Sequence, residues 1–582
     1  MLALVVLTTL VGMRLLALDL DPPDQVVPGY SGQAHYRDEA AKAHEARNRA
    51  NFGSWHLSEA DEYGFWRVQS PVWVYGERLW FEVFGVGLMQ ARAFVVVHGI
   101  ILLVLLCWLV QVRHGWEAAI AVTGLLGLNW AYIVYSRLAL MEGALLCWLV
   151  VATVGLSQID RRPERAPAWT VVAVLGMVGA CLTKQTGLLL VPPFVVALPW
   201  LGLRAAGSGK WPALRSGRAW LGELRTRLTR PAGWAAVLGV AVLVLILAAL
   251  FFNPQYQERL AFNAEHFTGA ETERGVVPRA VSLLSRGLFS SRLRLMFLVF
   301  APLMLWLSAA EGVRWVVVWV QARMHVARGL HPSGSSPGRA EGLRRRPDAI
   351  ERWMMAWLLL AVAANLASPH RAIRFQLVML PPAAYLGGVA AARAWVHTWS
   401  RVWVRAGVRG ILAVLALSGL GISGLRYAQW IDQGRSSVVD MGPQLEALIG
   451  DRHAVVVGEF AAQAVFDTPY WHFYVRPGQF NDSAEIIEAL GITHLVLDQD
   501  DFVERLIRRR SPALLKGRRA LGTLDFRGRT LVVWELVDAE HPPEPEPELE
   551  PIEESSRREP VPLRRGLRSV SRSEATESVP PP

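Results

Sequence analysis

The chain has 582 residues, 52% of them hydrophobic and 24 of them tryptophan. Several uncharged stretches approach about 20 residues, the length that crosses the apolar core of a bilayer, which excludes an ordinary soluble globular protein. The formal net charge is +10, but the arginines are concentrated in short segments between the hydrophobic stretches, where basic residues orient a membrane protein. We therefore expect no nucleic-acid partner.

The hydrophobic stretches predict a mainly α-helical, polytopic membrane protein with about eleven transmembrane helices. The expected spans are residues 1–18, 89–112, 116–135, 138–156, 169–182, 187–203, 234–252, 295–307, 353–366, 375–392 and 411–425. The first span is expected to be a retained helix, because no basic segment precedes it and no clear small-residue cleavage site follows. Cys107, Cys147 and Cys181 lie in these spans without paired spacing, which predicts neither disulfides nor a cysteine metal site.

The positive-inside rule orients these spans. If the N-terminus is cytoplasmic, the arginine-rich loops all fall on the cytoplasmic side; they are residues 161–162, 204–230, 314–346 and 393–409. An odd number of crossings then places the C-terminus outside. We expect a protein of the plasma (inner) membrane in which five segments share the outer face: residues 20–88, 135–137, 183–185, 253–290 and 368–374.

The chain divides into three expected parts. Residues 1–427 form the membrane domain, residues 428–537 a small extracytoplasmic α/β domain, and residues 538–582 a disordered tail. Within the second part, strands are expected at residues 453–457, 493–497 and 530–536 and a helix at residues 486–490, with two loosely packed pieces as the alternative. The tail is rich in Pro, Glu and Arg and has too few large apolar residues to offset the entropy of ordering.

A polar segment in the first outer loop carries an acidic pair, Asp38 and Glu39. Carboxylates close to the end of a span can meet both a lipid headgroup and a water-borne molecule. A helix from about residue 38 would place alanines on one face and charged residues on the other. Glu39 then falls on the alanine side and Asp38 on the charged side or at the N-cap. Periodicity leaves open which carboxylate faces a cavity, and a plain solvated helix is the alternative.

Basic residues mark two further points on the expected outer face. Lys184 stands where one span turns into the next, and its ammonium could hold a lipid-linked phosphate or only reach the membrane interface. Arg371 and Arg374 lie about one helical turn apart, just before a hydrophobic span. Their guanidiniums could form a fork around a phosphate or serve as interface anchors.

Two polar pairs complete the candidate groups. Glu265 and His266 follow the span at residues 234–252, and a Glu with a His could bind a divalent metal or orient an acceptor. Two ligands do not complete a metal site, and a loop histidine is more often solvated. Arg137 and Glu142 lie at an outer turn, where a buried structural ion pair is the alternative to substrate contact.

The order of short motifs resembles a known family. The acidic pair is followed by Ala46-Arg47-Asn48, Phe52-Gly53-Ser54-Trp55, Ser70-Pro71-Val72-Trp73, Phe84-Gly85-Val86 and Ala91-Arg92. This series resembles the first extracytoplasmic loop of the family 39 type membrane glycosyltransferases, the protein O-mannosyltransferase and aminoarabinose-transferase relatives. The resemblance extends over residues 1–390 and implies the GT-C fold and a dolichyl- or undecaprenyl-phosphate sugar as donor.

The resemblance also implies roles for the acidic residues. It places the catalytic carboxylate at the first member of the pair, so Asp38 is the expected base, and Glu39 would assist it or hold a cation. The segment with Glu265 and His266 looks like the E-H segment of the aminoarabinose-transferase branch, which makes this pair the candidate for acceptor or metal binding.

The basic residues are assigned in the same way. The segments around Lys184 and Arg137 resemble family segments, and the family associates a basic residue before a proline-led helix with the donor's phosphate. Lys184, Arg371, Arg374 and Arg137 are therefore the expected donor-binding residues. The chain departs from the commonest family form at Phe375, where a Tyr often follows the arginine.

We expect an enzyme that moves a hexose or pentose from a polyprenyl-phosphate donor to a hydroxyl of a lipid, glycan or protein of the cell envelope, inverting the anomeric centre. A lipid phosphate leaves without much acid help, so such an enzyme needs mainly a base for the acceptor and cations for the phosphate. A non-catalytic protein that binds or flips polyprenyl lipids and an oligosaccharide ligase are the alternatives. A divalent metal is the one candidate cofactor, and the residues name neither the sugar nor the acceptor.

Overall fold

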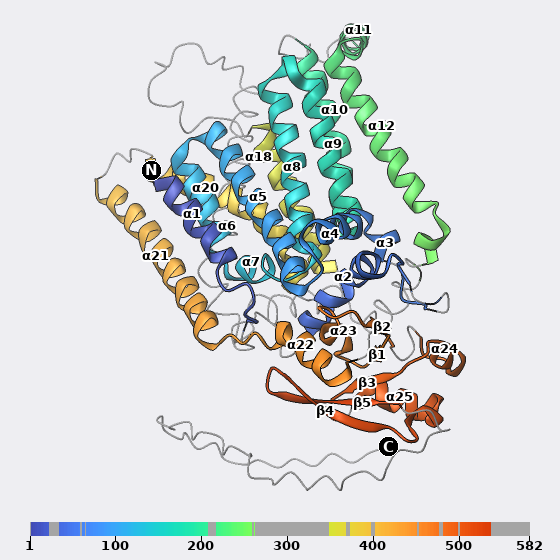
Figure 1. Ribbon diagram of the computed structural model, residues 1–582. Coiled ribbons are helices and arrows are strands. Elements are labelled where there is room, and N and C mark those ends of the chain that lie inside the picture. The colour runs from blue at the N-terminus through green and yellow to red at the C-terminus, as the bar shows by residue number, and fades with distance from the viewer. Residues whose placement is uncertain are drawn as a thin grey trace, which may run out of the picture.

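The computed structural model describes residues 2–22, 34–56, 58, 61–64, 66–207, 217–258, 261, 348–367, 373–396, 402–450, 453–475, 481–498 and 501–536. Over these residues the protein is mainly helical, as predicted. A bundle of long helices makes up most of it, a small sheet lies at one end, and the short helices of the first loop lie between the two (Figure 1).

In the described part of the chain, six helical segments are long and apolar enough to cross a membrane. They are α5 (Leu88–His114), α8 (Met141–Arg161), η1 with α9 (Pro163–Thr183), η2 with α10 (Gln185–Ala206), α12 (Pro231–Phe251) and η4 with α20 (Leu377–Val396). Helices α1 (Leu2–Leu15) and α6 (Trp116–Gly127) are shorter, and α18 (Ala349–Ala367) and α21 (Val402–Gln433) contain two more of the expected spans. The expected span at residues 295–307 lies outside the described residues, so the number eleven stays a prediction.

One expected span is wrong in detail. Residues 116–135 do not form one helix, because α6 ends at Gly127 and α7 (Trp130–Tyr135) begins after a break. Asn129 caps α7: its side-chain oxygen accepts the backbone N–H of Tyr132 at 3.1 Å. A polar side chain that satisfies a free amide favours a new helix start over a continuous helix.

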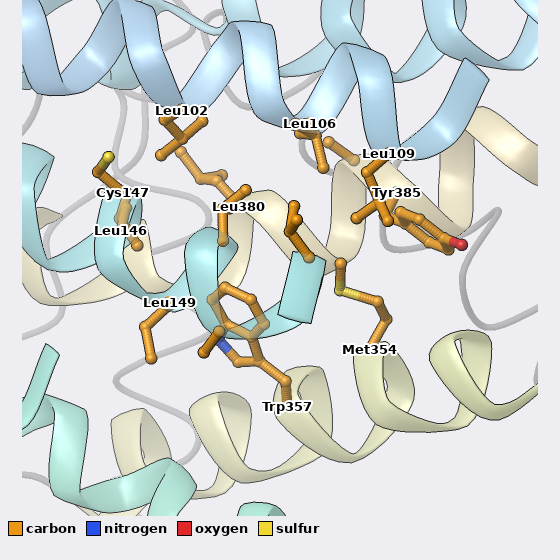
Figure 2. Packing of buried hydrophobic residues seen from close by; sticks show 14 of the residues in the cluster. Leu102, Leu106, Leu109, Leu146, Cys147, Leu149, Met354, Trp357, Leu380 and Tyr385 are labelled. Carbon is orange, nitrogen blue, oxygen red and sulfur yellow. The ribbon is translucent and has the colours of Figure 1, made fainter. Parts of the chain in front are cut away.

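Helix α8 lies at the centre of the bundle. In the apolar stretch of 18 residues of α8, 89% is buried. In the corresponding stretch of α12 only 17% is buried, so α12 lies at the periphery. Figure 2 shows side chains of α5, α8, α18 and α20 packed together, among them Leu106, Leu149 and Trp357. Close backbone approach holds α9 against α8, since a Cβ on Gly176 would lie only 2.3 Å from the backbone nitrogen of Ala152.

Charged groups lie at both ends of α8. At one end Arg113 Nη2 lies 3.0 Å from Asp160 and 3.0 Å from Asp348. Glu142 stands in the first turn at the other end. Eighteen residues at about 1.5 Å each separate Asp160 from Glu142 by roughly 27 Å, close to the apolar thickness of a bilayer. The two charged groups therefore belong to opposite membrane faces.

The C-terminal part holds a five-stranded sheet in the order β2-β1-β3-β5-β4. Strands β1 (Val455–Val457), β3 (His494–Leu497) and β5 (Arg529–Glu535) lie where strands are expected, and α24 (Ala484–Ala489) overlaps the expected helix. Strands β2 (Trp471–His472) and β4 (Arg519–Phe526) are additional. Strand β1 is parallel to β2 and β3, and β5 is antiparallel to β3 and β4. Helices α22 (Ser437–Ile449), α23 (Ala461–Ala464) and α25 (Phe502–Arg510) complete this part.

The first loop packs directly on the C-terminal part. Its helices α2 (Ala34–Phe52), α3 (Trp66–Gln69) and α4 (Pro71–Phe84) contribute Ala43, Trp73 and other residues to one apolar cluster with Met441 and Val456. The boundaries of the three expected domains stay predictions, and the tail beyond residue 536 lies outside the described residues. The shared cluster means that the helix with the acidic pair is fixed by the C-terminal part as well as by the bundle.

Candidate active site

Helix α2 is enclosed on nearly all sides. Every residue from 39 to 48 is buried, including Lys42 and Glu45 on the face that the sequence predicts to be charged. A plain solvated helix is therefore excluded. Burial against few neutralising groups raises the pKa of Glu45 to about 7.

The two members of the acidic pair, Asp38 and Glu39, have different surroundings in the structure. Glu39 is fully buried, and its carboxylate accepts two bonds of 3.1 Å from Arg92 and one of 2.7 Å from the Ala139 amide. Arg92 also donates to Asp21 at 2.7 Å. This buried network joins α2, α5 and the segment that follows α1, so the geometry of Glu39 is that of a structural residue.

Asp38 is different, because 32% of its side chain is exposed. One carboxylate oxygen is ion-paired with Arg374, and Lys42 Nζ lies 3.8 Å from the other. Asp38 is therefore the member of the pair that a water-borne acceptor can reach, and two cations hold it.

A small pocket adjoins this ion pair. It is lined by Glu142, Leu145, Leu146, Lys184, Thr186, Arg374, Leu377 and Val378. Lys184 follows α9 as its C-cap residue, and Arg374 lies in the short helix α19 (Ile373–Gln376) just before the η4–α20 span. Lys184 is ion-paired with Glu142, and Arg374 Nε lies 3.8 Å from the same carboxylate. Two cations thus face one pocket whose remaining wall is largely apolar.

Arg137 lies elsewhere. Its guanidinium donates to the carbonyls at the end of α1, to Leu16 at 2.8 Å and to Ala17, and it lies 4.1 Å from the centre of the Trp430 ring. It therefore joins α1 to α21 rather than lining the pocket. Glu142 pairs with Lys184 and Arg374, so the structural ion pair with Arg137 considered from the sequence is not formed.

Three of the expected site residues, Arg371, Glu265 and His266, lie outside the described residues. Within the described part of the chain, His114, Asp348 and Glu351 place ligand atoms within 4.8 Å of one another. This group lies at the far end of α8 from Asp38, and its carboxylates are ion-paired with Arg113 and Arg393, which disfavours a cation there.

Lys42 and Glu142 are the two residues of the arrangement that the sequence did not assign to the donor or the base. The spacing of Lys42 from Asp38, one helical turn, is a usable signal for a pair on one face. Glu142 is a candidate from the sequence together with Arg137, but its partners in the structure, Lys184 and Arg374, come from later segments of the chain and have no local signal.

Residues 69–262, a third of the chain, match the family model for dolichyl-phosphate-mannose-protein mannosyltransferases. Two solved structures of ArnT from Cupriavidus metallidurans have a similar fold. The one bound to undecaprenyl phosphate is 14% identical with a TM-score of 0.50, over 93% of this chain and 98% of that chain. The apo structure is 16% identical with a TM-score of 0.51, over 91% and 96%.

No curated protein matches the sequence. The match to the mannosyltransferase model and the ArnT-like fold agree with the order of motifs in the first loop. They confirm the resemblance predicted from the sequence: the chain is a membrane protein with the GT-C fold that resembles the family 39 type glycosyltransferases.

Proposed function

We propose that the protein transfers a sugar from a polyprenyl-phosphate donor to a hydroxyl acceptor at the outer face of the membrane, with inversion. One observation carries this proposal. A partly exposed carboxylate, Asp38, shares Arg374 with a pocket that also holds Lys184. A base beside a site for an anion is what this reaction requires.

The chemistry follows from the two halves of the arrangement. Asp38 would accept the proton of the acceptor hydroxyl while the oxygen of that hydroxyl forms a bond to the anomeric carbon. The bond from that carbon to the phosphate oxygen breaks, and the electron pair leaves with the polyprenyl phosphate. Lys184 and Arg374 would stabilise this phosphate. Attack opposite to the leaving phosphate inverts the anomeric centre.

Charge balance supports the same assignment. Among the described residues, Lys42, Lys184 and Arg374 bring three positive charges, and Asp38 and Glu142 bring two negative charges. The surplus of one cation matches the single negative charge of a phosphodiester donor. During transfer the leaving phosphate gains a negative charge while Asp38 becomes neutral, so the total within the site is unchanged.

The arginine distribution supports an extracytoplasmic site. Arg113, Arg204 and Arg393 all pair with carboxylates at the end of the bundle away from Asp38. The three native cysteines are buried, so one new cysteine can report the orientation. We expect Arg509→Cys, on the exposed side of α25, to react with a membrane-impermeant maleimide in intact cells. Labelling only after lysis would place the site in the cytoplasm.

The function itself is tested with Asp38→Asn. We suggest full-length protein in nanodiscs, a panel of undecaprenyl-phosphate sugars labelled in the sugar, and cell-envelope extract as acceptor. Asp38→Asn should lower transfer at least about 100-fold, the usual contribution of a general base, and should still bind undecaprenyl phosphate. Asp440→Asn changes an exposed carboxylate that accepts from Ser436 and is the matched control.

The same experiment separates the alternatives. A protein that only binds or flips polyprenyl lipids would show no transfer with any donor, while undecaprenyl phosphate still binds. An oligosaccharide ligase would use lipid-linked glycans and ignore single sugars. Unchanged transfer by Asp38→Asn would remove Asp38 from the role of base.

A further inference from the structure

We propose that Lys42 is the positioning residue for Asp38: it holds the carboxylate in place and ionised while Arg374 turns to the phosphate of the donor. The inference rests on the proposed function and adds to it a residue and a pH response that the family motifs do not assign. Its starting point is that both Lys42 and Arg374 contact Asp38, and that Arg374 lines the pocket whereas Lys42 does not.

The two partners hold different oxygens of Asp38. Arg374 pairs with Oδ2, and Lys42 Nζ lies 3.8 Å from Oδ1. Lys42 is on the same helix as Asp38, one turn further along, so a rigid movement of α2 does not change this contact. Arg374 comes from α19 and also lies 3.8 Å from Glu142. Its guanidinium is thus shared between Asp38 and the pocket.

Lys42 is fixed where it stands. Only 7% of its side chain is exposed, and its Nζ lies 5.2 Å from the centre of the Trp66 ring. Trp73 donates from its indole nitrogen to the backbone carbonyl of Lys42 at 3.2 Å. The amine is therefore enclosed beside Asp38, and Lys42 is not among the residues that line the pocket.

Donor binding makes Asp38 and the phosphate compete for Arg374. A phosphate in the pocket offers the guanidinium a bidentate partner, which weakens its hold on Asp38. A carboxylate that loses a nearby cation becomes easier to protonate and can also rotate away from the acceptor hydroxyl, which removes the base from its position. Lys42 stays beside Asp38 on the same helix, so the donor-bound state is the state in which its contact with Asp38 matters most.

The surroundings of Lys42 give it a titration near neutrality. Burial, opposed by Asp38, lowers the pKa of Lys42 to about 8, and the other charged groups that face it are Arg374, Glu142 and Lys184. Above that pH the amine loses its proton and its hold on Asp38. Transfer should therefore fall on the alkaline side from about pH 8, and an arginine in its place should remove this fall because arginine does not titrate there.

The test compares Lys42→Met and Lys42→Arg with the unchanged full-length protein in nanodiscs. The readout independent of transfer is the pH dependence of carbodiimide labelling of Asp38, which reports its protonation, measured by peptide mass spectrometry with and without undecaprenyl phosphate. We expect Lys42→Met to raise the midpoint by about 1 pH unit, and by more when the lipid is bound, because an opposite charge this close lowers a carboxyl pKa by at least that much. Lys42→Arg should restore the midpoint.

In transfer assays we expect Lys42→Met to lower kcat at least about tenfold at pH 7 with KM for the donor changed less than about twofold, as for an interaction that acts on the base and not on donor binding. Lys42→Arg should keep most of kcat and lose the alkaline limb. Equal labelling midpoints in the methionine variant and the unchanged protein would overturn the proposal. The proposal would also be overturned if Lys42→Met lost as much undecaprenyl phosphate binding as Arg374→Gln does, since Lys42 would then be a phosphate ligand. Absence of transfer by the unchanged protein with every donor would instead refute the proposed function, and full transfer by Asp38→Asn would remove Asp38 from the role of base.

Discussion

Arg47 connects the helix that carries Asp38 to the C-terminal part, and its removal gives the sharpest structural prediction. Its guanidinium donates to four backbone carbonyls of one turn: Val465 at 2.6 Å, Phe466 at 2.9 Å, Thr468 at 2.7 Å and Tyr470 at 2.7 Å. The side chain is fully buried, and burial lowers the pKa of Arg47 to about 10, so it remains charged at neutral pH. Four carbonyls thus satisfy one buried cation.

The size of the effect can be worked from these bonds. In Arg47→Met the Val465 carbonyl keeps a hydrogen bond, because it also accepts the Thr468 amide at 3.0 Å. The loss is therefore counted from the three other carbonyls, those of Phe466, Thr468 and Tyr470. At about 1–1.5 kcal/mol for each, the loss is about 4 kcal/mol. Since about 1.4 kcal/mol corresponds to a tenfold change, local opening should become roughly a thousand times more frequent.

Hydrogen exchange measured by mass spectrometry tests this in the full-length protein. We expect peptides from α2 and from residues 461–472 to lose protection together in Arg47→Met, and transfer to fall because Asp38 is no longer held. Arg49→Met is the control, since the hydrogen bond of Arg49 is a local one to the Gly53 carbonyl within the same loop. Equal exchange in the two variants would refute the reasoning.

Three further changes have definite expected outcomes. Glu77 is fully buried, neither carboxylate oxygen has a partner in the described part of the chain, and burial raises its pKa well above the ordinary value. Because a raised folded-state pKa costs stability as pH rises, Glu77→Leu should stabilise the protein against heat at pH 8 and by less at pH 4. Glu39→Gln should cost about 3 kcal/mol, because the buried Arg92 loses the carboxylate of Glu39 and keeps that of Asp21; loss of folded protein in detergent measures this cost. Lys184→Met should weaken undecaprenyl phosphate binding about tenfold, measured by titration, and equal affinity would remove Lys184 from the phosphate site.

The membrane helices could be expected from the sequence because their signal is local. A run of apolar residues long enough to cross a bilayer needs no knowledge of its neighbours. The break between α6 and α7 is harder to foresee, since Asn129 is one polar residue in an apolar run and its role depends on the cap it forms. Strand β2 is only two residues long, too short for any period to be visible.

The site was only partly foreseeable for a related reason. Periodicity assumes one face toward water, but α2 packs on the bundle, on α4 and on the C-terminal part. It therefore could not decide between Asp38 and Glu39, and it suggested a solvated face for Lys42, which is buried. The partners of Arg137 are backbone carbonyls at the end of α1, which no residue pattern reveals.

A structure of the full-length protein with undecaprenyl phosphate in nanodiscs, determined by electron cryomicroscopy, tests the central proposal most directly. We expect the phosphate within hydrogen-bonding distance of Lys184 and Arg374, with Arg374 drawn away from Asp38 and Lys42 still beside it. A phosphate bound at the other end of the bundle, among Arg113 and Arg393, would contradict the proposed site.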